Sequence, residues 1–453
     1  MPNKTQRIRD PIHGLINFEG TDKVDMTAWK LIRTPEFQRL RRIKQLGVSE
    51  FVFPGATHTR FAHSIGVYHN ARKLMRIINL SMKDAFDQER SKTVLLAALL
   101  HDVGHGPFSH AFEGARYEIG RERGEVVKNH EKFSALLITA EDGSICKILG
   151  TYAAKQIAQL LEADEPTDFY HAVVSSSFDA DRLDYLVRDR YMTGTQSGTI
   201  DEEWLLDNLI TENVTSWQDG DDVDSVQIPT FVFKNKARYA VEDFLLARFR
   251  LYHQVYMHKT TRGFERLLSA LLKHIGNRAD SPAILGLSPD VPLLKFLSPK
   301  GETLTNYRRL DDTSIWTVIE QLTHSSDYFA KKLACRIWNR EPLKIIDVSA
   351  KYQNDPVEFG NALKHLQNFK TENRDIVMFE DQASFDLYSE SNEENGKVHK
   401  MVRVKDPDGH QKEIFEFGDT IISKRLQKKI MLTRYYFLES DDRTSAEKAM
   451  IGG

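Results

Sequence analysis

The chain has 453 residues, of which 41% are hydrophobic and 28% are charged, and its formal net charge is −3. This composition excludes a disordered or collagen-like chain, and the weakly acidic balance offers no global attraction for nucleic acid, so nucleic acid is not a favoured partner. The length exceeds the size at which one hydrophobic core stops growing, which predicts a large domain with a smaller one appended.

Two features bear on the compartment. Cys146 and Cys335 are too few for a disulfide framework and are typical of a reducing environment, so we expect a cytoplasmic protein. The longest uninterrupted apolar run, residues 94–100, is too short to cross a bilayer, and we expect neither a membrane partner nor a secretory leader.

Taken in order, the first half of the chain predicts an extended arm followed by helices. Residues 1–22 form the arm, with a turn at 10–14 where Pro11 and Gly14 favour reversal. Apolar spacing predicts a helix over 26–45, with a restart at Thr34 because a Thr-Pro-Glu sequence is a typical helix start. The further expectations are a short strand or turn at 51–55, a helix opening at 59–64, a surface excursion over 114–128, and helices from 129 and over 153–161.

The second half of the chain predicts a long helix, followed by a proline-rich stretch and a second domain. A helix is expected from about 236 to 275, after a strand-like region at 213–235. Four prolines between 282 and 299 place a boundary near 300, dividing a first domain (1–300) from an α+β domain (301–453). Within the latter we expect helices at 313–322 and 326–338, a strand at 343–346, a hairpin joining 398–405 to 412–417, an exposed loop at 389–396 and a solvated basic face at 424–429.

The stretch from His101 to His110 carries the densest chemistry. It follows the apolar run 94–100, which predicts a buried helix that ends at Gly104 and Gly106. That helix would deliver His101 and Asp102 to its C-terminal end. Burying several imidazoles beside an apolar helix is costly unless each finds a partner, and a metal ion is a partner that imidazole and carboxylate can share.

His63 and Asp181 are the natural candidates to complete such a cluster. Two imidazoles and two carboxylates would leave coordination positions open for water and substrate. Clustered titratable groups can also be structural, so spacing alone leaves a metal site and a structural cluster as alternatives.

The order His63, His101-Asp102, Asp181 matches the pattern after which the HD phosphohydrolase superfamily is named. Further motifs resemble those of deoxynucleoside triphosphate triphosphohydrolases, in particular the SAM-and-HD-domain enzymes and their bacterial relatives. The resemblance covers residues 6–275 and thins after 300, and no SAM domain is expected. The motifs that carry it are DPIHG (10–14), FQRLR (37–41), KQLG (44–47), VFPGA (52–56), RFAHS (60–64) and HDVGHGPFSH (101–110).

This resemblance implies a mostly α fold, an HD-domain helical fold with a smaller α+β C-terminal domain. It implies hydrolysis of deoxynucleoside triphosphates (dNTPs) to deoxynucleoside and tripolyphosphate, with one divalent metal (Fe, Mn, Zn or Ni) and Mg²⁺ on the substrate phosphates. The implied metal ligands are His63, His101, Asp102 and Asp181. The implied catalytic residues are His110 as general acid, positioned by His105, His130 and Glu131.

The resemblance also implies how substrate is held. Arg60, Arg182 and Arg248 would clamp the triphosphate, because the planar guanidinium matches phosphate oxygens, and Tyr185 would add a hydroxyl. Gln45, Asp189 and Tyr256 would hold the 3′-hydroxyl of the sugar, and Leu46 with Tyr256 would crowd the 2′ position.

Family members form dimers or tetramers with nucleotide bound between subunits, so a homo-oligomer and an allosteric nucleotide are expected partners. Animal relatives read the guanine of that nucleotide with an Asp and an Asn, where this chain has Arg33 and Arg9. Guanine readout is therefore not implied for this chain.

Two alternatives remain open at this stage. One is another HD chemistry, a phosphodiesterase or nuclease acting on cyclic nucleotides or single-stranded nucleic acid, which would need an open groove with aromatic platforms. The other is a nucleotide-sensing defence component whose catalysis is secondary.

Overall fold

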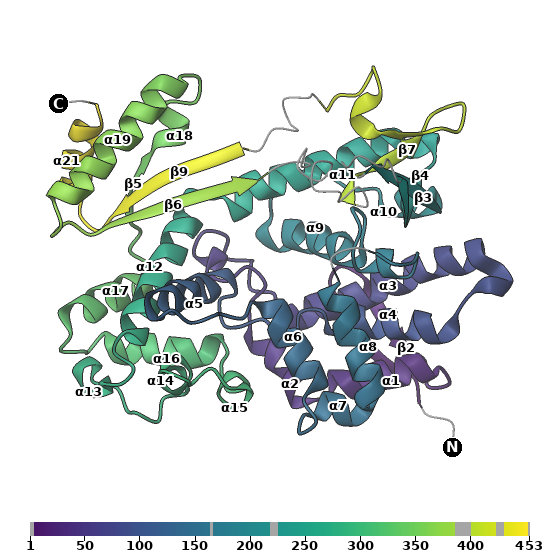
Figure 1. The fold of residues 1–453 in the computed structure, drawn as a ribbon, viewed down its shortest axis with the longest axis horizontal. Helices are drawn as coiled ribbons and strands as arrows, with labels where there is room; N and C mark the ends of the chain where they lie inside the picture. The colour runs from purple at the N-terminus through teal and green to yellow at the C-terminus, as the bar shows by residue number, and fades with distance from the viewer. Residues whose placement is uncertain (1–3, 164–165, 218–224, 386–399, 423–429, 452–453) are drawn as a thin grey trace.

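The computed structural model describes residues 4–163, 166–217, 225–385, 400–422 and 430–451 (Figure 1). Over these residues the fold is mostly α, as expected, with small antiparallel and mixed sheets. The loop expected at 389–396 and the basic face expected at 424–429 lie outside the described residues. No helix in the described ranges combines the length and the apolarity needed to span a bilayer.

The N-terminal part of the chain forms a β-hairpin and a set of packed helices. Its elements are β1 (Gln6–Asp10), β2 (Gly14–Phe18), α1 (Lys23–Ile32), α2 (Pro35–Gln38), η1 (Arg39–Arg42), η2 (Ser49–Phe51), α3 (Arg60–Met82), η3 (Lys83–Ala85), α4 (Gln88–Leu100), α5 (His110–Arg123), α6 (His130–Thr139), α7 (Ser144–Leu149), α8 (Thr151–Glu162) and η4 (His171–Val173).

Local chemistry explains the first of these elements. The arm turns at Asp10, whose carboxylate accepts the backbone N–H of Ile12 and His13, and Gly14 supplies a φ of +67°. The helical stretch expected over 26–45 restarts at Thr34 as predicted, because Thr34 caps a new helix on the N–H of Phe37 with Pro35 in its first position.

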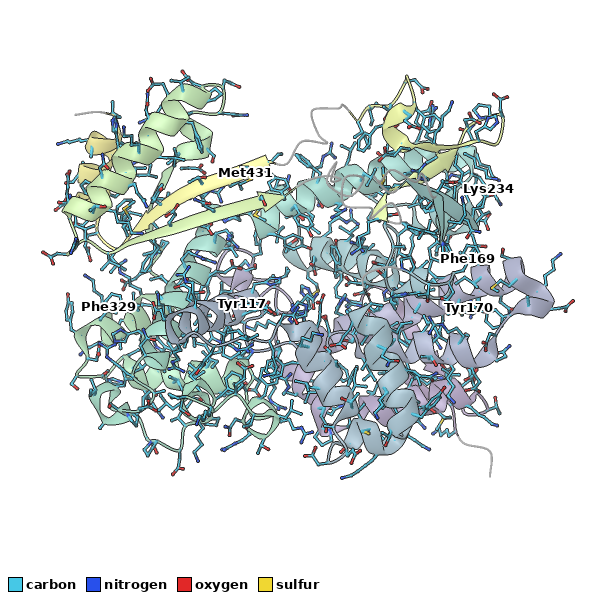
Figure 2. The ribbon with its side chains drawn as sticks, viewed as in Figure 1. Tyr117, Phe169, Tyr170, Lys234, Phe329 and Met431 are labelled. Atoms are coloured by element: carbon cyan, nitrogen blue, oxygen red, sulfur yellow. The ribbon has the colours of Figure 1, made fainter. Side chains whose placement is uncertain are left out.

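The helix that carries the central motif is fixed at both ends. Asp87 caps α4 by accepting from Glu89 and Arg90, and its own N–H donates to the hydroxyl of Tyr170 (labelled in Figure 2). Every residue from Val94 to Leu100 is buried, as the apolar run predicts. The region 114–128, expected as a surface excursion, is largely helical in α5, because Ala115 and Ile119 are buried and α5 packs against α12 (Lys259–Gly276).

The remaining elements build the other wall of the site and the C-terminal part. They are α9 (Ala180–Thr193), α10 (Glu202–Asp207), β3 (Leu209–Trp217), β4 (Ser225–Phe233), η5 (Asn235–Ala237), α11 (Arg238–Leu251), η6 (Tyr252–Tyr256), α12 (Lys259–Gly276), α13 (Pro282–Leu285), α14 (Pro292–Leu297), α15 (Leu304–Tyr307), α16 (Asp312–Leu322), α17 (Tyr328–Trp338), β5 (Lys344–Asp347), α18 (Val348–Lys351), α19 (Pro356–Glu372), β6 (Met378–Phe385), β7 (Arg403–Lys405), β8 (Gln411–Glu413), η8 (Ile414–Glu416), β9 (Ile430–Phe437) and α21 (Ser440–Met450).

The single long helix expected from 236 to 275 is wrong, because α11 passes into a π-helical turn, η6, and a new helix starts after His258. Side chains of η6 face the cavity described below, and π-helical turns are frequent at functional sites. The hairpin expected around residues 406–409 is present as β7 and β8, paired antiparallel.

The described residues form three sheets. β1 pairs with β2, β3-β4-β7-β8 form a second sheet, and β5-β9-β6 form a third that α18, α19 and α21 accompany at the upper left of Figure 1. The large apolar core includes side chains from Ile16 to Leu438, among them the helices between 285 and 337. A smaller core lies between Ile346 and Met450. The domain boundary near 300 stays a prediction.

Candidate functional site

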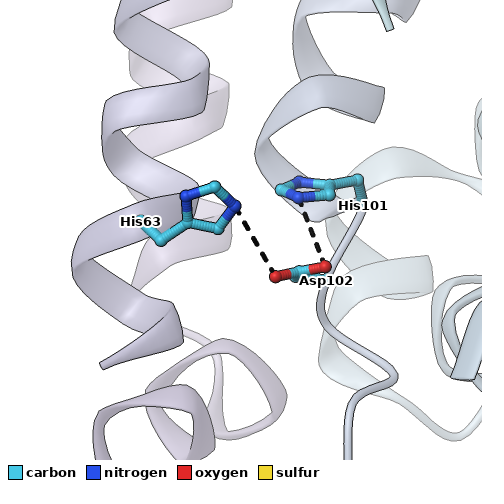
Figure 3. Close-up of side chains that lie close together, drawn as sticks. All are labelled: His63, His101 and Asp102. Atoms are coloured by element: carbon cyan, nitrogen blue, oxygen red, sulfur yellow. Dashed lines mark ion pairs between the residues drawn. The ribbon is translucent and has the colours of Figure 1, made fainter. Parts of the chain in front are cut away.

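The structure brings together the four side chains predicted as metal ligands, from three separate helices. His63 lies in the first turn of α3, His101 and Asp102 follow α4, and Asp181 lies in the first turn of α9, which packs on α3. His63 Nε2 lies 3.8 Å from Asp102 and 3.0 Å from Asp181, and His101 Nε2 lies 3.2 Å from Asp102 and 3.9 Å from Asp181. Figure 3 shows both imidazoles turned toward the Asp102 carboxylate.

A buried network orients His63. Its Nδ1 donates to Asp184 at 2.8 Å, and the same carboxylate contacts His13 Nε2 at 2.6 Å and accepts from Arg188. Arg188 in turn donates to Asp10 at 2.8 Å, so the N-terminal hairpin is tied to the ligand through this chain of contacts. Asp184 and Arg188 form an ion pair within α9, and Asp184 also holds the imidazole of His63.

His101 is likewise held through one ring nitrogen, which leaves the other, Nε2, available to a metal ion. Its Nδ1 lies 2.9 Å from the carbonyl of Ala98, whereas Nε2 is buried without a hydrogen-bond partner. Ligating imidazoles are typically held by a hydrogen bond on the far nitrogen, which leaves the near nitrogen free for a metal. His63, His101 and Asp102 place ligand atoms within 4.8 Å of one another, so the group could hold a divalent metal ion.

The site also favours positive charge. Burial lowers the pKa of His63, but Asp181 and Asp184 outweigh it and raise that pKa to about 10. Burial raises the pKa of Asp102, but His101, Arg60 and His105 outweigh it and hold that pKa well below the ordinary value. A cluster that keeps carboxylates ionised and attracts a proton onto a buried imidazole is electrostatically suited to a cation.

Beside this cluster stand three more imidazoles. His105 stacks on His130 with ring centroids 4.0 Å apart, and His110 meets His105 edge-on at 6.4 Å. Burial, and then Arg60, lower the pKa of His105 well below its ordinary value, so this ring is neutral at pH 7. His110 is the exposed member, with 72% of its side chain accessible to solvent.

Glu113 is a carboxylate that lies beside two of these imidazoles, His110 and His130, and the sequence analysis did not predict it as a site residue. It lies 3.8 Å from His110 Nδ1 and 3.4 Å from His130 Nδ1, and it also accepts the backbone N–H of His130. The predicted Glu131 lies on the cavity wall, but its carboxylate accepts from Asn129.

The loop between Asp102 and His110 is held from outside. The buried guanidinium of Arg39 donates to the carbonyls of Val103 and His105, and the hydroxyl of Tyr307 donates to that of Gly104. Gly104 leaves no room for a side chain, since a Cβ there would lie 2.1 Å from the backbone nitrogen of Ser134. These contacts therefore hold the backbone of the loop that carries His105 and His110 in one position.

The four predicted metal ligands and the three further imidazoles line one cavity of about 490 Å³. Arg60 lies on its wall, where it donates to Asp102 at 2.5 Å and to the hydroxyl of Ser109. The predicted site residues on the wall are Gln45, Leu46, Arg60, His63, His101, Asp102, His105, His110, His130, Glu131, Asp181, Tyr185, Asp189 and Tyr256.

The residues predicted to hold the sugar lie together at this wall. The hydroxyl of Tyr256 donates to Asp189 at 2.6 Å, and His58 contacts the other oxygen of that carboxylate at 2.7 Å. The side-chain oxygen of Gln45 is buried without a hydrogen-bond partner. An orphaned acceptor is costly unless a ligand hydroxyl or water satisfies it, so it marks a position for a donor.

Two predicted phosphate ligands are not among the wall residues. Arg182 donates to the carbonyl of Ser176 and pairs with Asp179, the residue that caps α9. Arg248 lies over the ring of Tyr252, 5.6 Å from its centroid. Wall residues that were not predicted as site residues from the sequence include Ser109, Tyr252, Thr261, Arg262 and Glu265.

Comparison with known proteins places these features in context. The model of the HD domain family matches residues 60–186, the span from Arg60 to the helix that carries Asp181. The uncharacterized protein YwfO of Bacillus subtilis is 32% identical over 341 residues, which cover 75% of this chain and 71% of that protein.

Two further matches carry descriptions of activity. The deoxynucleoside triphosphate triphosphohydrolase SAMHD1 of Bos taurus is 35% identical over 219 residues, 42% of this chain and 36% of that enzyme. This chain thus matches about a third of the length of that enzyme. The crystal structure of a phosphohydrolase from Bacteroides thetaiotaomicron superposes with a TM-score of 0.73 at 27% identity, covering 96% of this chain and 100% of that one.

Proposed function

Because the chain belongs to the HD-domain phosphohydrolase family, we propose that it hydrolyses dNTPs to deoxynucleoside and tripolyphosphate. The observation that carries this proposal is a single cavity that holds the His63, His101 and Asp102 cluster together with Gln45, Leu46, Asp189 and Tyr256. A candidate phosphate-cleaving centre and a set of groups suited to a deoxyribose thus line the same cavity. SAMHD1 relatives, which by name act on dNTPs, support the substrate class.

His63, His101, Asp102 and Asp181 would hold one divalent metal, which supplies Lewis acidity toward a phosphoryl oxygen and acidifies a water nucleophile. Arg60 would neutralise phosphate charge. His110, the exposed imidazole of the set, would pass a proton to the leaving 5′ oxygen, with His105 and His130 stacked behind it. A metal of the Fe, Mn, Zn or Ni type suits imidazole and carboxylate donors, with Mg²⁺ on the phosphates.

The sugar end would select the substrate. Gln45, Asp189 and Tyr256 would bind the 3′-hydroxyl, since the buried oxygen of Gln45 needs a donor. Leu46 beside Tyr256 would exclude a 2′-hydroxyl by leaving it without a hydrogen-bond partner. Arg182 and Arg248 would need to change side-chain conformation to contact the triphosphate.

A product assay tests this function. The purified protein is incubated with each dNTP, each NTP and a labelled oligonucleotide, in Mn²⁺, Mg²⁺ or Fe²⁺, and tripolyphosphate is measured. Tripolyphosphate from dNTPs alone supports the proposal, whereas a shortened oligonucleotide without tripolyphosphate supports a nuclease. If neither product forms until a second nucleotide or a protein is added, the result supports a sensing role.

Assembly and location belong to the same proposal. We expect a homo-oligomer, a dimer or tetramer with a nucleotide at an allosteric site, which light scattering with and without nucleotide would detect. A dNTP substrate and the free thiols of Cys146 and Cys335 support a cytoplasmic location.

A further inference from the structure

One buried carboxylate outside the site connects two walls of the cavity. Asp312, the first residue of α16, accepts the backbone N–H of Phe108 at 2.8 Å with one oxygen and that of Lys44 at 2.9 Å with the other. The residues that follow these two N–H groups, Gln45 on one side and Ser109 on the other, line the cavity. Asp312 therefore bridges the sugar wall and the imidazole wall.

The same face of α16 makes a second pair of contacts. Trp316 lies one helical turn after Asp312, so both side chains project from one face. Its ring meets Phe108 edge-on at 5.7 Å and Phe51 at 6.0 Å. Phe51 follows the Gln45–Leu46 segment and Phe108 precedes Ser109. Helix α16 thus contacts the chain on both sides of Gln45–Leu46, at Lys44 and Phe51, and it contacts Phe108 both by a hydrogen bond and by ring packing.

The imidazole wall needs such support because its backbone is strained. Phe108 and Ser109 are consecutive non-glycine residues with φ of +51° and +48°. Such conformations persist only where the surroundings hold them. Asp312 holds the N–H of Phe108, and the hydroxyl of Ser109 is held by Arg60.

The surroundings of Asp312 disfavour the ionised form of its carboxyl group. Only 4% of the residue is exposed, and burial raises the pKa of its carboxyl to about 6 although two backbone N–H groups lower it. A group kept where its charge is disfavoured is a candidate for function rather than for stability.

We propose that Asp312 is a positioning residue that sets the separation of the Gln45–Leu46 wall from the Ser109–His110 wall, and so sets discrimination between deoxyribo- and ribonucleotides. This inference rests on the proposed function. Leu46 would exclude the 2′-hydroxyl only if the sugar is pressed against it while the phosphates engage the opposite wall. A bridge that fixes the gap between the two walls decides that fit.

Asp312→Asn is the discriminating variant. Its side chain has nearly the same shape, but one acceptor oxygen becomes an NH₂ donor that must face a backbone N–H, so one of the two contacts is lost. Asp311→Asn is the matched control. Asp311 caps α16, and Asn caps a helix equally well; the change removes the ion pair with Arg42, whose side chain is 51% exposed, and one negative charge near Asp312 and Arg39, but it leaves both hydrogen bonds to Asp312 in place.

The experiment measures kcat and KM for one dNTP and its matching NTP, with melting temperature, in the wild-type, Asp312→Asn and Asp311→Asn proteins. We expect Asp312→Asn to lower kcat/KM for the dNTP about 10- to 100-fold, as misplacement by an ångström does. We expect the preference for dNTP over NTP to fall about tenfold, the size of a small steric discrimination. Asp311→Asn should keep the wild-type preference.

Three outcomes decide the matter. If Asp312→Asn keeps the wild-type dNTP preference, including the case in which kcat/KM falls equally for both substrates, the inference is overturned and the proposed function stays intact. A wild-type protein that cleaves no dNTP ends the proposed function, and this inference falls with it. If Asp312→Asn does not fold, Trp316→Phe decides, because a smaller ring on the same face should weaken the preference in the same direction.

Discussion

Asp184 accepts a hydrogen bond from His63 Nδ1 at 2.8 Å, and both side chains are almost fully buried. This contact fixes the ring so that Nε2 faces Asp102 and Asp181. The carboxylate is itself surrounded by donors, Arg188 and His13, so it has no alternative orientation. The geometry of the candidate metal centre therefore depends on residues that are not among its predicted ligands.

Asp184→Asn should weaken metal binding. In either orientation the amide nitrogen faces a donor of Arg188, and in one of them it also faces His63 Nδ1, so the network that orients the imidazole is disrupted. Loss of such a partner typically lowers metal affinity by about 10- to 100-fold. Isothermal titration with Mn²⁺ measures this without any substrate. Glu141→Gln, at an exposed position, is the control, and Mn²⁺ affinity equal to wild type in Asp184→Asn would contradict the role assigned to Asp184.

Gly66→Ala should destabilise the fold. A Cβ on Gly66 would lie 1.8 Å from Asp184 Oδ1 and 2.6 Å from Arg188 Nη2, so the buried pair must move. Overpacking of this kind costs about 1–3 kcal/mol, measured by urea unfolding. Gly114→Ala is the matched control, because that Cβ meets nothing closer than 3.9 Å and Ala favours a helix. Equal stability of the two variants would refute the packing argument.

Metal removal should abolish hydrolysis reversibly. Dialysis against a chelator should leave the protein folded, since none of the four predicted metal ligands belongs to the large apolar core, and Mn²⁺ or Fe²⁺ should restore activity. Asp102→Ala should stay inactive under the same reloading, because it removes a ligand. Turnover by Asp102→Ala, or activity that survives complete metal removal, would require a different mechanism.

Glu113 should make the folded state sensitive to acid. Burial raises the pKa of Glu113, but the neighbouring imidazoles of His110 and His130 outweigh it and hold the pKa far below its usual 4.5. A carboxyl whose pKa is depressed on folding contributes stability that is present above the unfolded value and is lost as the pH falls below it.

Melting temperatures between about pH 5 and about pH 3 should therefore fall more steeply for the wild type than for Glu113→Gln. The variant should also lower kcat, because His110 loses the carboxylate beside it. Glu141→Gln again serves as the control and should follow the wild-type curve. Parallel curves for all three proteins would show that Glu113 makes no such contribution.

Much of the site could be predicted because its residues sit in short, ordered motifs. The buried helix over 94–100 and the cap at Thr34 follow from local propensity, and the convergence of His63, His101, Asp102 and Asp181 follows from the motif series. Glu113 could not be found this way, because an acid in a first helical turn is common and only tertiary packing brings it to His130. Arg39 likewise gives no local signal of its contact with the loop carbonyls.

The break in the helix expected over 236–275 has a similar cause. Nothing in the apolar spacing around Tyr252 distinguishes a π-helical turn from an α-helix, since the two differ by one residue per turn at a single point. The turn is accompanied by the hydrogen bond from Tyr256 to Asp189, a residue 67 positions away.

The sequence by itself determined a mostly helical chain, the apolar helix that ends in His101 and Asp102, and the residue types suited to a metal. Those properties depend on propensity and spacing, which act over a few residues. Only the tertiary structure decided which carboxylate holds which imidazole, that Arg182 and Arg248 do not line the cavity wall, and that Asp312 bridges two loops from 204 and 268 residues away. Burial and long-range hydrogen bonds choose among chemically equivalent side chains, and that choice has no local signature in the sequence.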